Sequence, residues 1–229
     1  KSLNELTIRD KFSIWFMSPL GKIVFSIEKE QLGDILPELF GYHILQFGYA
    51  AELDFLNSSR ISNKIVLFLE HSEINKKIDM SIRATAEDLP ITMDSIDVVL
   101  LPHILEYSKD AHKLLREIDR VLTPEGYAVI IGINPFSLWG LWHIIFCCWN
   151  KMPWSGHLIS VSRMKDWLSL LDFEITKVKY FFFSPPLSNV KLLKKFLPLE
   201  RLGKYCYPIF GGLYIVVAKK RIAPLTPIR

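Results

Sequence analysis

The chain has 229 residues, of which 50% are hydrophobic and 23% are charged, and its formal net charge is +4. This length and composition indicate one globular domain with a sizeable core, and they exclude a disordered chain. The lysines and arginines are dispersed and form no block of like charge, so nothing here favours a nucleic-acid-binding protein.

The chain has three cysteines, Cys147, Cys148 and Cys206, and two of them are adjacent. This usage does not fit a disulfide framework and predicts a reducing, cytoplasmic compartment. Residues 1–11 lack the apolar stretch of a signal peptide. The longest apolar run, Leu138 to Trp149, is interrupted by His143 and is shorter than the roughly 20 residues that span a bilayer. We therefore expect no transmembrane helix.

The first predicted helix begins at Ser18-Pro19, where serine can cap the helix and proline favours its first turn. The apolar residues of this helix follow at helical spacing: Leu20, Ile23, Val24, Ile27, Leu32 and Ile35. Pro37 and Gly41 end the helix. His43–Gly48 is a short apolar run that closes on glycine, which is typical of a buried strand and its turn. A brief helix is predicted next, over Ala50–Leu56.

Four strands are predicted in the middle of the chain. The strand over Lys64–Glu70 is continuously apolar and ends on an acid, as expected of a parallel strand buried on both faces. A helix is predicted from near Asp110, and the turn Thr123–Gly126 ends it. Strands that alternate with helices predict an α/β fold with a mostly parallel sheet and helices on both faces. The four strands are Lys64–Glu70, Ile78–Ala84, Ser95–Leu101 and Tyr127–Ile133.

The last third of the chain contains a helix predicted over Val161–Leu171 and strands over Phe173–Phe183 and Gly212–Lys219, which complete the same sheet. The whole chain is therefore predicted to be a single domain. Its parts are an N-terminal helical cap over 1–40, a core sheet over 42–134, an aromatic-rich insertion and lid over 135–172, C-terminal strands with an excursion over 173–221, and a tail over 222–229.

Three blocks of the sequence resemble successive blocks of the methyltransferase type 11 family: Ala84–Ile91, Asp97–Leu100 and Leu115–Gly126. The likeness covers residues 15–135, and Asn134–Leu141 is similar to an uncharacterised bacterial branch of that family. The resemblance implies a Rossmann-like class I methyltransferase fold. It also implies S-adenosylmethionine as the cofactor and S-adenosylhomocysteine as the product, with the cofactor lying across the carboxyl ends of the first strands.

The family carries an acid-x-Gly-x-Gly-x-Gly loop after its first strand, because the backbone must come close to the cofactor there. The matching residues are Gln46, Gly48, Ala50 and Glu52, so only the first glycine is retained. Gly48, Tyr49 and Ala50 are the cofactor contacts that the resemblance implies in this loop. Gly48 is alternatively an ordinary turn glycine at a strand end.

Further cofactor contacts are predicted at the ends of the following strands. Glu70 can accept hydrogen bonds from both ribose hydroxyls; alternatively it is a solvated glutamate. Thr85 stands where the family usually has an acid, so Ala86 and Glu87 are predicted to meet the adenine through their backbone, unless this segment is a plain turn. Leu101, at the end of its strand, completes the predicted set.

His103, Tyr107 and Asn134 are the catalytic candidates. His103 follows a predicted strand at the rim where the sulfonium and the methyl acceptor should meet, and a histidine can serve there as a general base. The alternative is a polar or packing residue at the rim. Tyr107, Asn134 and the nearby Glu106 are candidates for orienting the acceptor. Methyl transfer depends more on alignment and desolvation than on proton transfer, so its catalytic residues leave little signal.

The aromatic segment from Trp139 to Trp149 either shapes a pocket for a hydrophobic acceptor or packs in the core. Together with Lys151, Lys191, Lys194, Lys195 and Arg201, it could also contact an anionic membrane surface. Three functions stay open: a methyltransferase acting on a small hydrophobic or aromatic acceptor, a degenerate methyltransferase fold used for binding or regulation, and a peripheral membrane protein. We expect a monomer or a homodimer and no metal site.

Overall fold

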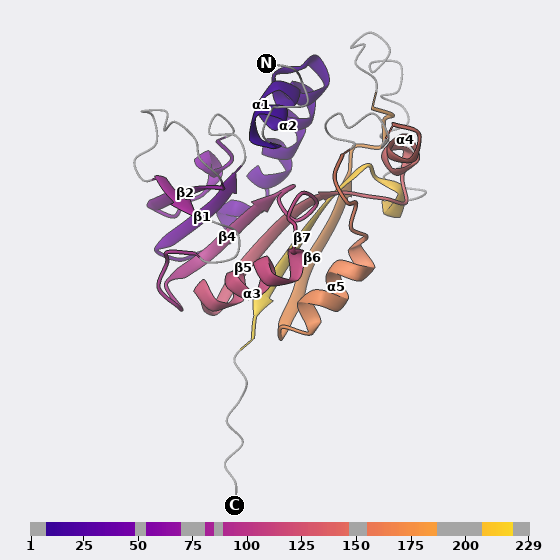
Figure 1. The fold of residues 1–229 in the computed structure, drawn as a ribbon. Coiled ribbons are helices and arrows are strands. Elements are labelled where there is room, and N and C mark those ends of the chain that lie inside the picture. The colour runs from indigo at the N-terminus through magenta and orange to yellow at the C-terminus, as the bar shows by residue number, and fades with distance from the viewer. Residues whose placement is uncertain are drawn as a thin grey trace, which may run out of the picture.

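The computed structural model describes residues 8–48, 54–69, 81–84, 89–146, 155–186 and 208–221. Within these residues a seven-stranded sheet has the order β3-β2-β1-β4-β5-β7-β6 (Figure 1). The strands are β1 (His43–Gly48), β2 (Asn63–Leu69), β3 (Ser81–Ala84), β4 (Ile96–Pro102), β5 (Leu122–Ile133), β6 (Phe173–Phe181) and β7 (Leu213–Lys220).

The first five strands of the sheet are parallel, and β7 runs antiparallel to both of its neighbours, β5 and β6. This arrangement confirms the predicted mostly parallel sheet. From β1 the chain proceeds outward through β2 and β3, and then returns to place β4 on the other side of β1. The strand order therefore reverses between β1 and β4, and such a switch point is where open α/β sheets bind ligands.

Five α-helices accompany the sheet in the described ranges. Figure 1 shows α3 and α5 in front of the sheet and the α1–α2 pair above it. The helices are α1 (Ile8–Met17), α2 (Pro19–Gly33), α3 (Ala111–Val121), α4 (Leu138–Phe146) and α5 (Val161–Ser169). Short 3₁₀ turns occur at η2 (Leu36–Glu38), η3 (Leu56–Ser58) and η5 (Pro208–Phe210).

Side-chain caps fix where the helices begin. The Ser18 hydroxyl accepts a hydrogen bond from the Gly21 amide at 3.1 Å, and the Asp110 carboxylate accepts one from the Lys113 amide at 2.9 Å. Both helix starts were predicted, and both are confirmed. Gly21 also allows α2 to approach α1, because a Cβ at this position would lie 2.1 Å from the carbonyl oxygen of Trp15.

Some predicted boundaries differ from the structure. α2 ends at Gly33, before Pro37, and the helix α1 was not predicted. The turn Thr123–Gly126 lies inside β5, where the partners of Ile96 and Val98 are Leu122 and Tyr127, so the four residues between them bulge out of the ladder. α3 therefore ends at Val121 and leads directly into β5 at Leu122, without a separate loop. Most of the helix predicted over Ala50–Leu56, and most of the excursion predicted over Pro185–Pro208 between the last two strands, falls outside the described residues.

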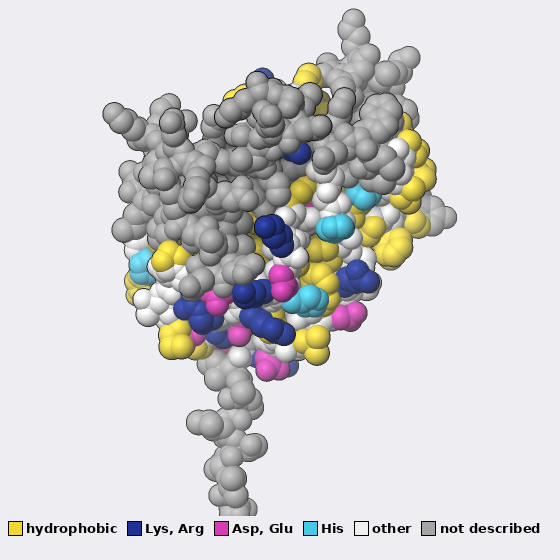
Figure 2. Space-filling model, viewed as in Figure 1, with side chains coloured by type: hydrophobic (Ala, Val, Ile, Leu, Met, Phe, Trp, Pro, Cys, Tyr) yellow, Lys and Arg dark blue, Asp and Glu magenta, His cyan; other side chains and the backbone are white. Residues whose placement is uncertain are grey.

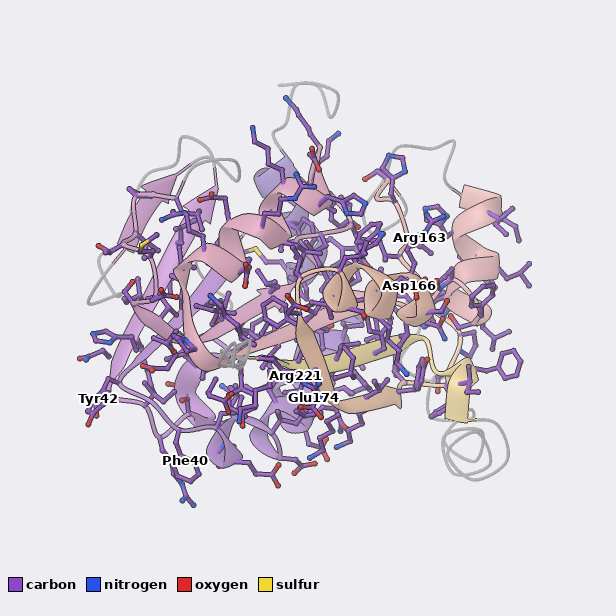
Figure 3. All side chains as sticks on the ribbon, turned by 90° about the horizontal axis from the view of Figure 1, so that it is seen from below. Phe40, Tyr42, Arg163, Asp166, Glu174 and Arg221 are labelled. Atoms are coloured by element: carbon purple, nitrogen blue, oxygen red, sulfur yellow. The ribbon has the colours of Figure 1, made fainter. Side chains whose placement is uncertain are left out.

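Figure 3 shows the amino-end edge of the parallel strands. Phe40 and Tyr42 project outward there, with 72% and 79% of their surface exposed. Glu174 pairs with Arg221, with 3.1 Å between the carboxylate and Nε, and this contact ties the start of β6 to the residue after β7. Asp97 accepts hydrogen bonds from the amides of Tyr42 and His43. The polar contacts of this edge therefore hold strand ends together.

An apolar surface surrounds α4 in the described part of the chain. Figure 2 shows hydrophobic side chains gathered where α4 lies in Figure 1. Trp139 also belongs to α4, but its side chain is fully buried and is not part of this surface. None of the described helices is long and apolar enough to cross a membrane. The exposed members of the surface are Phe136, Leu138, Leu141, Ile144, Ile145, Ile209 and Phe210.

Candidate functional site

The carboxyl ends of β1, β2, β3 and β4 come together at one edge of the sheet. Gly48 is the last residue of β1 and pairs with Phe68, and Leu69 of β2 pairs with Ala84 of β3. Leu101 is buried in β4 and pairs with Ile130. The other predicted cofactor residues, Tyr49, Ala50, Glu70, Ala86 and Glu87, lie outside the described residues, as do Glu52 and Thr85.

Gln46, which stands where the resembling family has an acid, is a buried residue of β1. Its side-chain oxygen accepts a hydrogen bond from the Phe55 amide at 3.3 Å. This bond joins β1 to the chain beyond residues 49–53. The amide therefore has a structural partner, and the position brings no negative charge to the end of β1.

His103 is the first residue after β4 and has an unusual backbone conformation. Its φ of 54° lies in the left-handed region, which non-glycine residues seldom occupy. The His103 amide donates to the Ile131 carbonyl of β5 at 2.9 Å. A conformation of this kind persists where surrounding contacts hold it, and such contacts are present on both sides of the ring.

Two buried carboxylates enclose the His103 ring. Glu28 Oε1 lies 2.6 Å from Nε2, and Glu106 Oε2 lies 3.2 Å from Nδ1. The second Glu106 oxygen accepts a hydrogen bond from the Ile133 amide. The relative exposures of Glu28, His103 and Glu106 are 0%, 3% and 2%. We call these three residues the buried triad; it joins α2 to the turn after β4 and to the end of β5.

The buried triad holds His103 in its protonated form. Burial alone would lower the pKa of the imidazole, but the charges and hydrogen bonds of Glu28 and Glu106 outweigh burial and raise the pKa from 6.5 to about 10. Both ring nitrogens then donate to carboxylates, so no nitrogen lone pair is available to take a proton. A base role for His103, which the sequence suggests, therefore does not follow from this geometry.

The raised pKa of His103 predicts that stability declines with rising pH. The folded protein keeps the imidazolium proton up to about pH 10, whereas the unfolded chain loses it near pH 6.5. The contribution of this proton to the free energy of unfolding is therefore complete below pH 6.5 and is lost as pH rises toward 10. Urea unfolding of the wild type and of His103→Gln at several pH values checks this. Parallel pH profiles for the two proteins would contradict it.

Glu28 was not among the residues expected at the site, although the sequence contains a signal for it. Glu28 lies four residues after Val24 and four before Leu32, so it occupies the apolar face of α2. An acid in that stripe is unusual, because a buried charge needs a partner. The partner is His103, which is 75 residues further along the chain.

Asn134, predicted to orient an acceptor, has its side chain engaged within the fold. Its Nδ2 donates to the carbonyls of Ile209 and Gly211 at 2.7 and 2.9 Å. Its Oδ1 accepts from the Phe136 amide at 3.1 Å. Both amide protons are therefore used to hold η5 and the start of β7 against the end of β5, which makes Asn134 a positioning residue in this structure.

Tyr107, the third catalytic candidate, packs between α1 and a neighbouring loop. Its ring centroid lies 4.7 Å from that of Phe12, with the rings nearly perpendicular. Phe16, one turn further along α1, lies 6.4 Å from the His103 ring. Trp15 packs edge-on against Phe16. The aromatic residues of α1 therefore cover the turn after β4, next to the buried triad.

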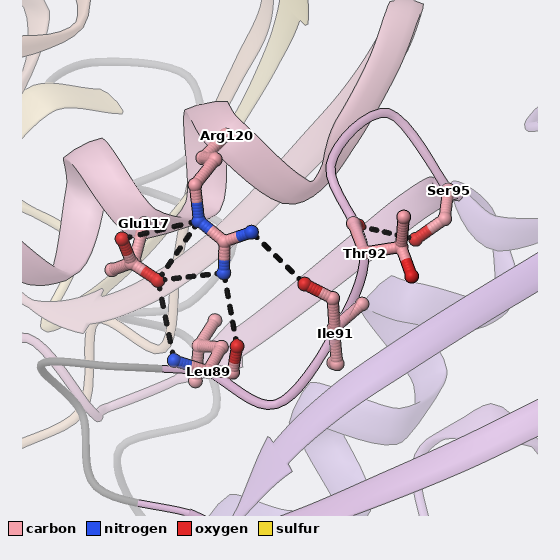
Figure 4. A network of polar contacts seen from close by, with 6 residues as sticks. All are labelled: Leu89, Ile91, Thr92, Ser95, Glu117 and Arg120. Atoms are coloured by element: carbon pink, nitrogen blue, oxygen red, sulfur yellow. Dashed lines mark hydrogen bonds and ion pairs between the residues drawn. The ribbon is translucent and has the colours of Figure 1, made fainter.

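A second polar network holds the segment that follows residues 85–88 (Figure 4). Arg120 of α3 donates to the carbonyls of Leu89 and Ile91 and pairs with Glu117 at 2.9 Å. Glu117 in turn accepts from the Leu89 amide. Hydrogen bonds from Arg120 lower the pKa of Glu117, so this carboxylate stays charged at neutral pH. The network fixes the approach of the chain to β4.

Comparison with known proteins agrees with this geometry. Residues 61–130 match a family model described as a methyltransferase domain. The chain is 31% identical over 214 residues to the uncharacterized protein YafS of Escherichia coli, covering 93% of this chain and 82% of that protein. The chain belongs to the class I methyltransferase family.

Solved structures show the same class I methyltransferase fold. A Thermotoga maritima S-adenosylmethionine-dependent methyltransferase, described as a possible histamine N-methyltransferase, matches with a TM-score of 0.68 and 18% identity, over 93% of this chain and 96% of that one. A Mesorhizobium loti S-adenosylmethionine-dependent methyltransferase matches with a TM-score of 0.58 and 18% identity, over 83% and 96% of the two chains.

The cofactor that this family implies is S-adenosylmethionine, and the described residues fit it. Gly48 ends β1 at the switch point with no side chain to obstruct a ligand. Glu28 Oε2 is buried and has no hydrogen-bond partner in the part of the chain that the structure describes. A buried anionic oxygen beside the end of β4 suits a ligand that carries positive charge.

Proposed function

We propose that the protein transfers a methyl group from S-adenosylmethionine to a small hydrophobic or aromatic acceptor. The observation that carries this proposal is the switch point between β1 and β4, where parallel strands end side by side. The family model spans β2 to β5 and supports it independently. The cofactor supplies an electrophilic methyl group when bound, so the protein needs chiefly to align and desolvate the reactants.

The residues of this chain divide the binding task between the strand ends. We assign the ribose hydroxyls to Glu70, directly after β2, and the adenine to the backbone of Ala86 and Glu87, after β3. Gly48, Tyr49 and Ala50 follow as contacts at the end of β1. His103 takes part as a buried cation that fixes the turn after β4.

The aromatic residues around the turn after β4 support an apolar acceptor. Phe12, Phe16 and Tyr107 gather beside the buried triad, and Phe12 and Phe16 are almost completely buried. Such rings exclude water from neighbouring groups and pack against flat apolar ligands. Hydrophobic recognition next to the methyl-transfer position is therefore the favoured arrangement.

Thermal unfolding with and without S-adenosylhomocysteine tests the proposal. A ligand present at 100 times its dissociation constant stabilises a protein by about 2.7 kcal/mol. For a chain of this size, that raises Tm by about 5–10 °C. Glu70→Ala should reduce the shift, because the ribose loses its acceptor, and adenine alone should give a smaller one. No shift at millimolar ligand would contradict enzymatic activity and favour a binding or regulatory role.

A further inference from the structure

The Glu28 carboxylate is satisfied on one side only. Oε1 contacts His103 at 2.6 Å, whereas Oε2 is the one buried side-chain oxygen without a hydrogen-bond partner among the residues that the structure describes. A buried carboxylate oxygen that lacks a hydrogen-bond partner is costly. Glu28 Oε2 is therefore a buried hydrogen-bond acceptor that the described residues leave unused.

The buried triad also carries one uncompensated negative charge. Glu28 and Glu106 each contribute one negative charge, and the His103 imidazolium contributes one positive charge. Buried charges are normally balanced by partners. A ligand with one net positive charge would neutralise the cluster, and S-adenosylmethionine is such a ligand, because it carries a sulfonium, an ammonium and a carboxylate.

The position of the triad matches one end of the proposed cofactor site. Ribose and adenine are assigned to the ends of β2 and β3, so the methionyl end falls over β1 and β4. His103 is the first residue after β4, and Glu28 contacts it. At the end of β1 the usual acid is replaced by the neutral Gln46, whose oxygen accepts from Phe55. Of the two acids of the buried triad, Glu28 is the one with an oxygen that no described residue contacts by a hydrogen bond, so it is placed to supply negative charge on this side.

We propose that Glu28, through Oε2, binds the cationic methionyl end of S-adenosylmethionine and takes over the role of the acid missing from the first-strand loop. This inference rests on the proposed function, since it names a contact within the same site. The positive groups available are the ammonium, which can donate a hydrogen bond to Oε2, and the sulfonium, which interacts with it through charge alone.

Calorimetric titration of Glu28→Gln with S-adenosylmethionine and S-adenosylhomocysteine tests the contact and separates the two sources. Loss of a charged hydrogen bond should weaken binding by about ten- to a hundredfold. If Oε2 binds the ammonium, both ligands weaken alike, because both carry it. If Oε2 faces the sulfonium, S-adenosylmethionine weakens and S-adenosylhomocysteine, which lacks that charge, changes little. Either pattern supports the proposal.

Glu30→Gln is the matched control, because it removes the same charge from an exposed position of the same helix. Its affinities should equal those of the wild type. Glu28→Gln retains an oxygen for His103 and leaves a neutral His103–Glu106 pair. If Glu28→Gln does not fold, Glu28→Asp takes its place. Aspartate keeps the charge, but its shorter side chain moves the carboxylate oxygens away from the ligand, so weaker binding is again expected.

Two results would overturn the proposal, and they differ. If the wild type and folded Glu28→Gln bind both ligands equally well, Glu28 is only a structural partner of His103 and the proposed function stands. If the wild type binds neither ligand, the proposed function itself is wrong, and the Glu28 contact is lost with it.

Discussion

His103→Ala is expected to lower the free energy of unfolding by about 3–5 kcal/mol, the usual cost of removing one partner from a buried ion pair. The substitution leaves Glu28 and Glu106 facing each other with no cation between them, and both are buried. It also places alanine at a φ of 54°, a conformation that the side-chain contacts of His103 hold in the wild type. Equilibrium urea unfolding at pH 7 measures the loss.

His157→Ala provides the control, because His157 is exposed and its removal should change stability by less than about 0.5 kcal/mol. Adding Glu28→Gln to His103→Ala should restore part of the lost stability, since one of the two opposed charges is then gone. The coupling between the two sites should be about 0.5–3 kcal/mol. Additive losses, or a cost below 1 kcal/mol for His103→Ala, would contradict the ion-pair account.

Trp139→Ala is expected to cost about 3–5 kcal/mol of unfolding free energy, as large aromatic truncations in a core do. Trp139 is fully buried and packs against Phe182, with ring centroids 5.4 Å apart. Its Nε1 donates to the Ser184 carbonyl at 3.0 Å. The substitution therefore opens a cavity and removes the hydrogen bond to the Ser184 carbonyl. Thermal and urea unfolding report the change.

Ile144→Ala on the same helix is the comparison for Trp139→Ala. Ile144 is 70% exposed, so its truncation should change stability by less than about 0.5 kcal/mol. Trp139→Phe keeps most of the volume but loses the hydrogen bond, and an intermediate cost of about 1–3 kcal/mol is expected. Equal effects of Trp139→Ala and Ile144→Ala would mean that α4 is not anchored through Trp139.

These two substitutions separate the parts of the aromatic segment that the sequence could not distinguish. Packing in the core, recognition of an acceptor and contact with a surface all require large apolar side chains. The structure places Trp139 in the core and leaves Leu141 and Ile144 exposed. The reason is helical geometry. Leu141 and Ile144 follow Trp139 by two and five residues, and at these spacings the side chains lie on the opposite side of the helix.

The sequence alone determined the sheet and the order in which its strands occur. Apolar runs closed by glycine, acid or proline gave β1, β2 and β4 within a residue or two. Ser18 and Asp110 fixed the starts of α2 and α3, because a cap acts on amides only three residues away. The blocks around Asp97 and Leu115 indicated the family. All of these signals are local, so a linear reading can detect them.

Only the tertiary structure decided what the residues at the site can do. Glu28 meets His103 across 75 residues, and Asn134 reaches Ile209 across the same separation. Neither contact can be read from local spacing. His103 was expected as a candidate base, yet two carboxylates that converge on it hold it as a cation. Charge state depends on burial and on partners brought together by packing, and those are properties of the folded chain rather than of the residue sequence.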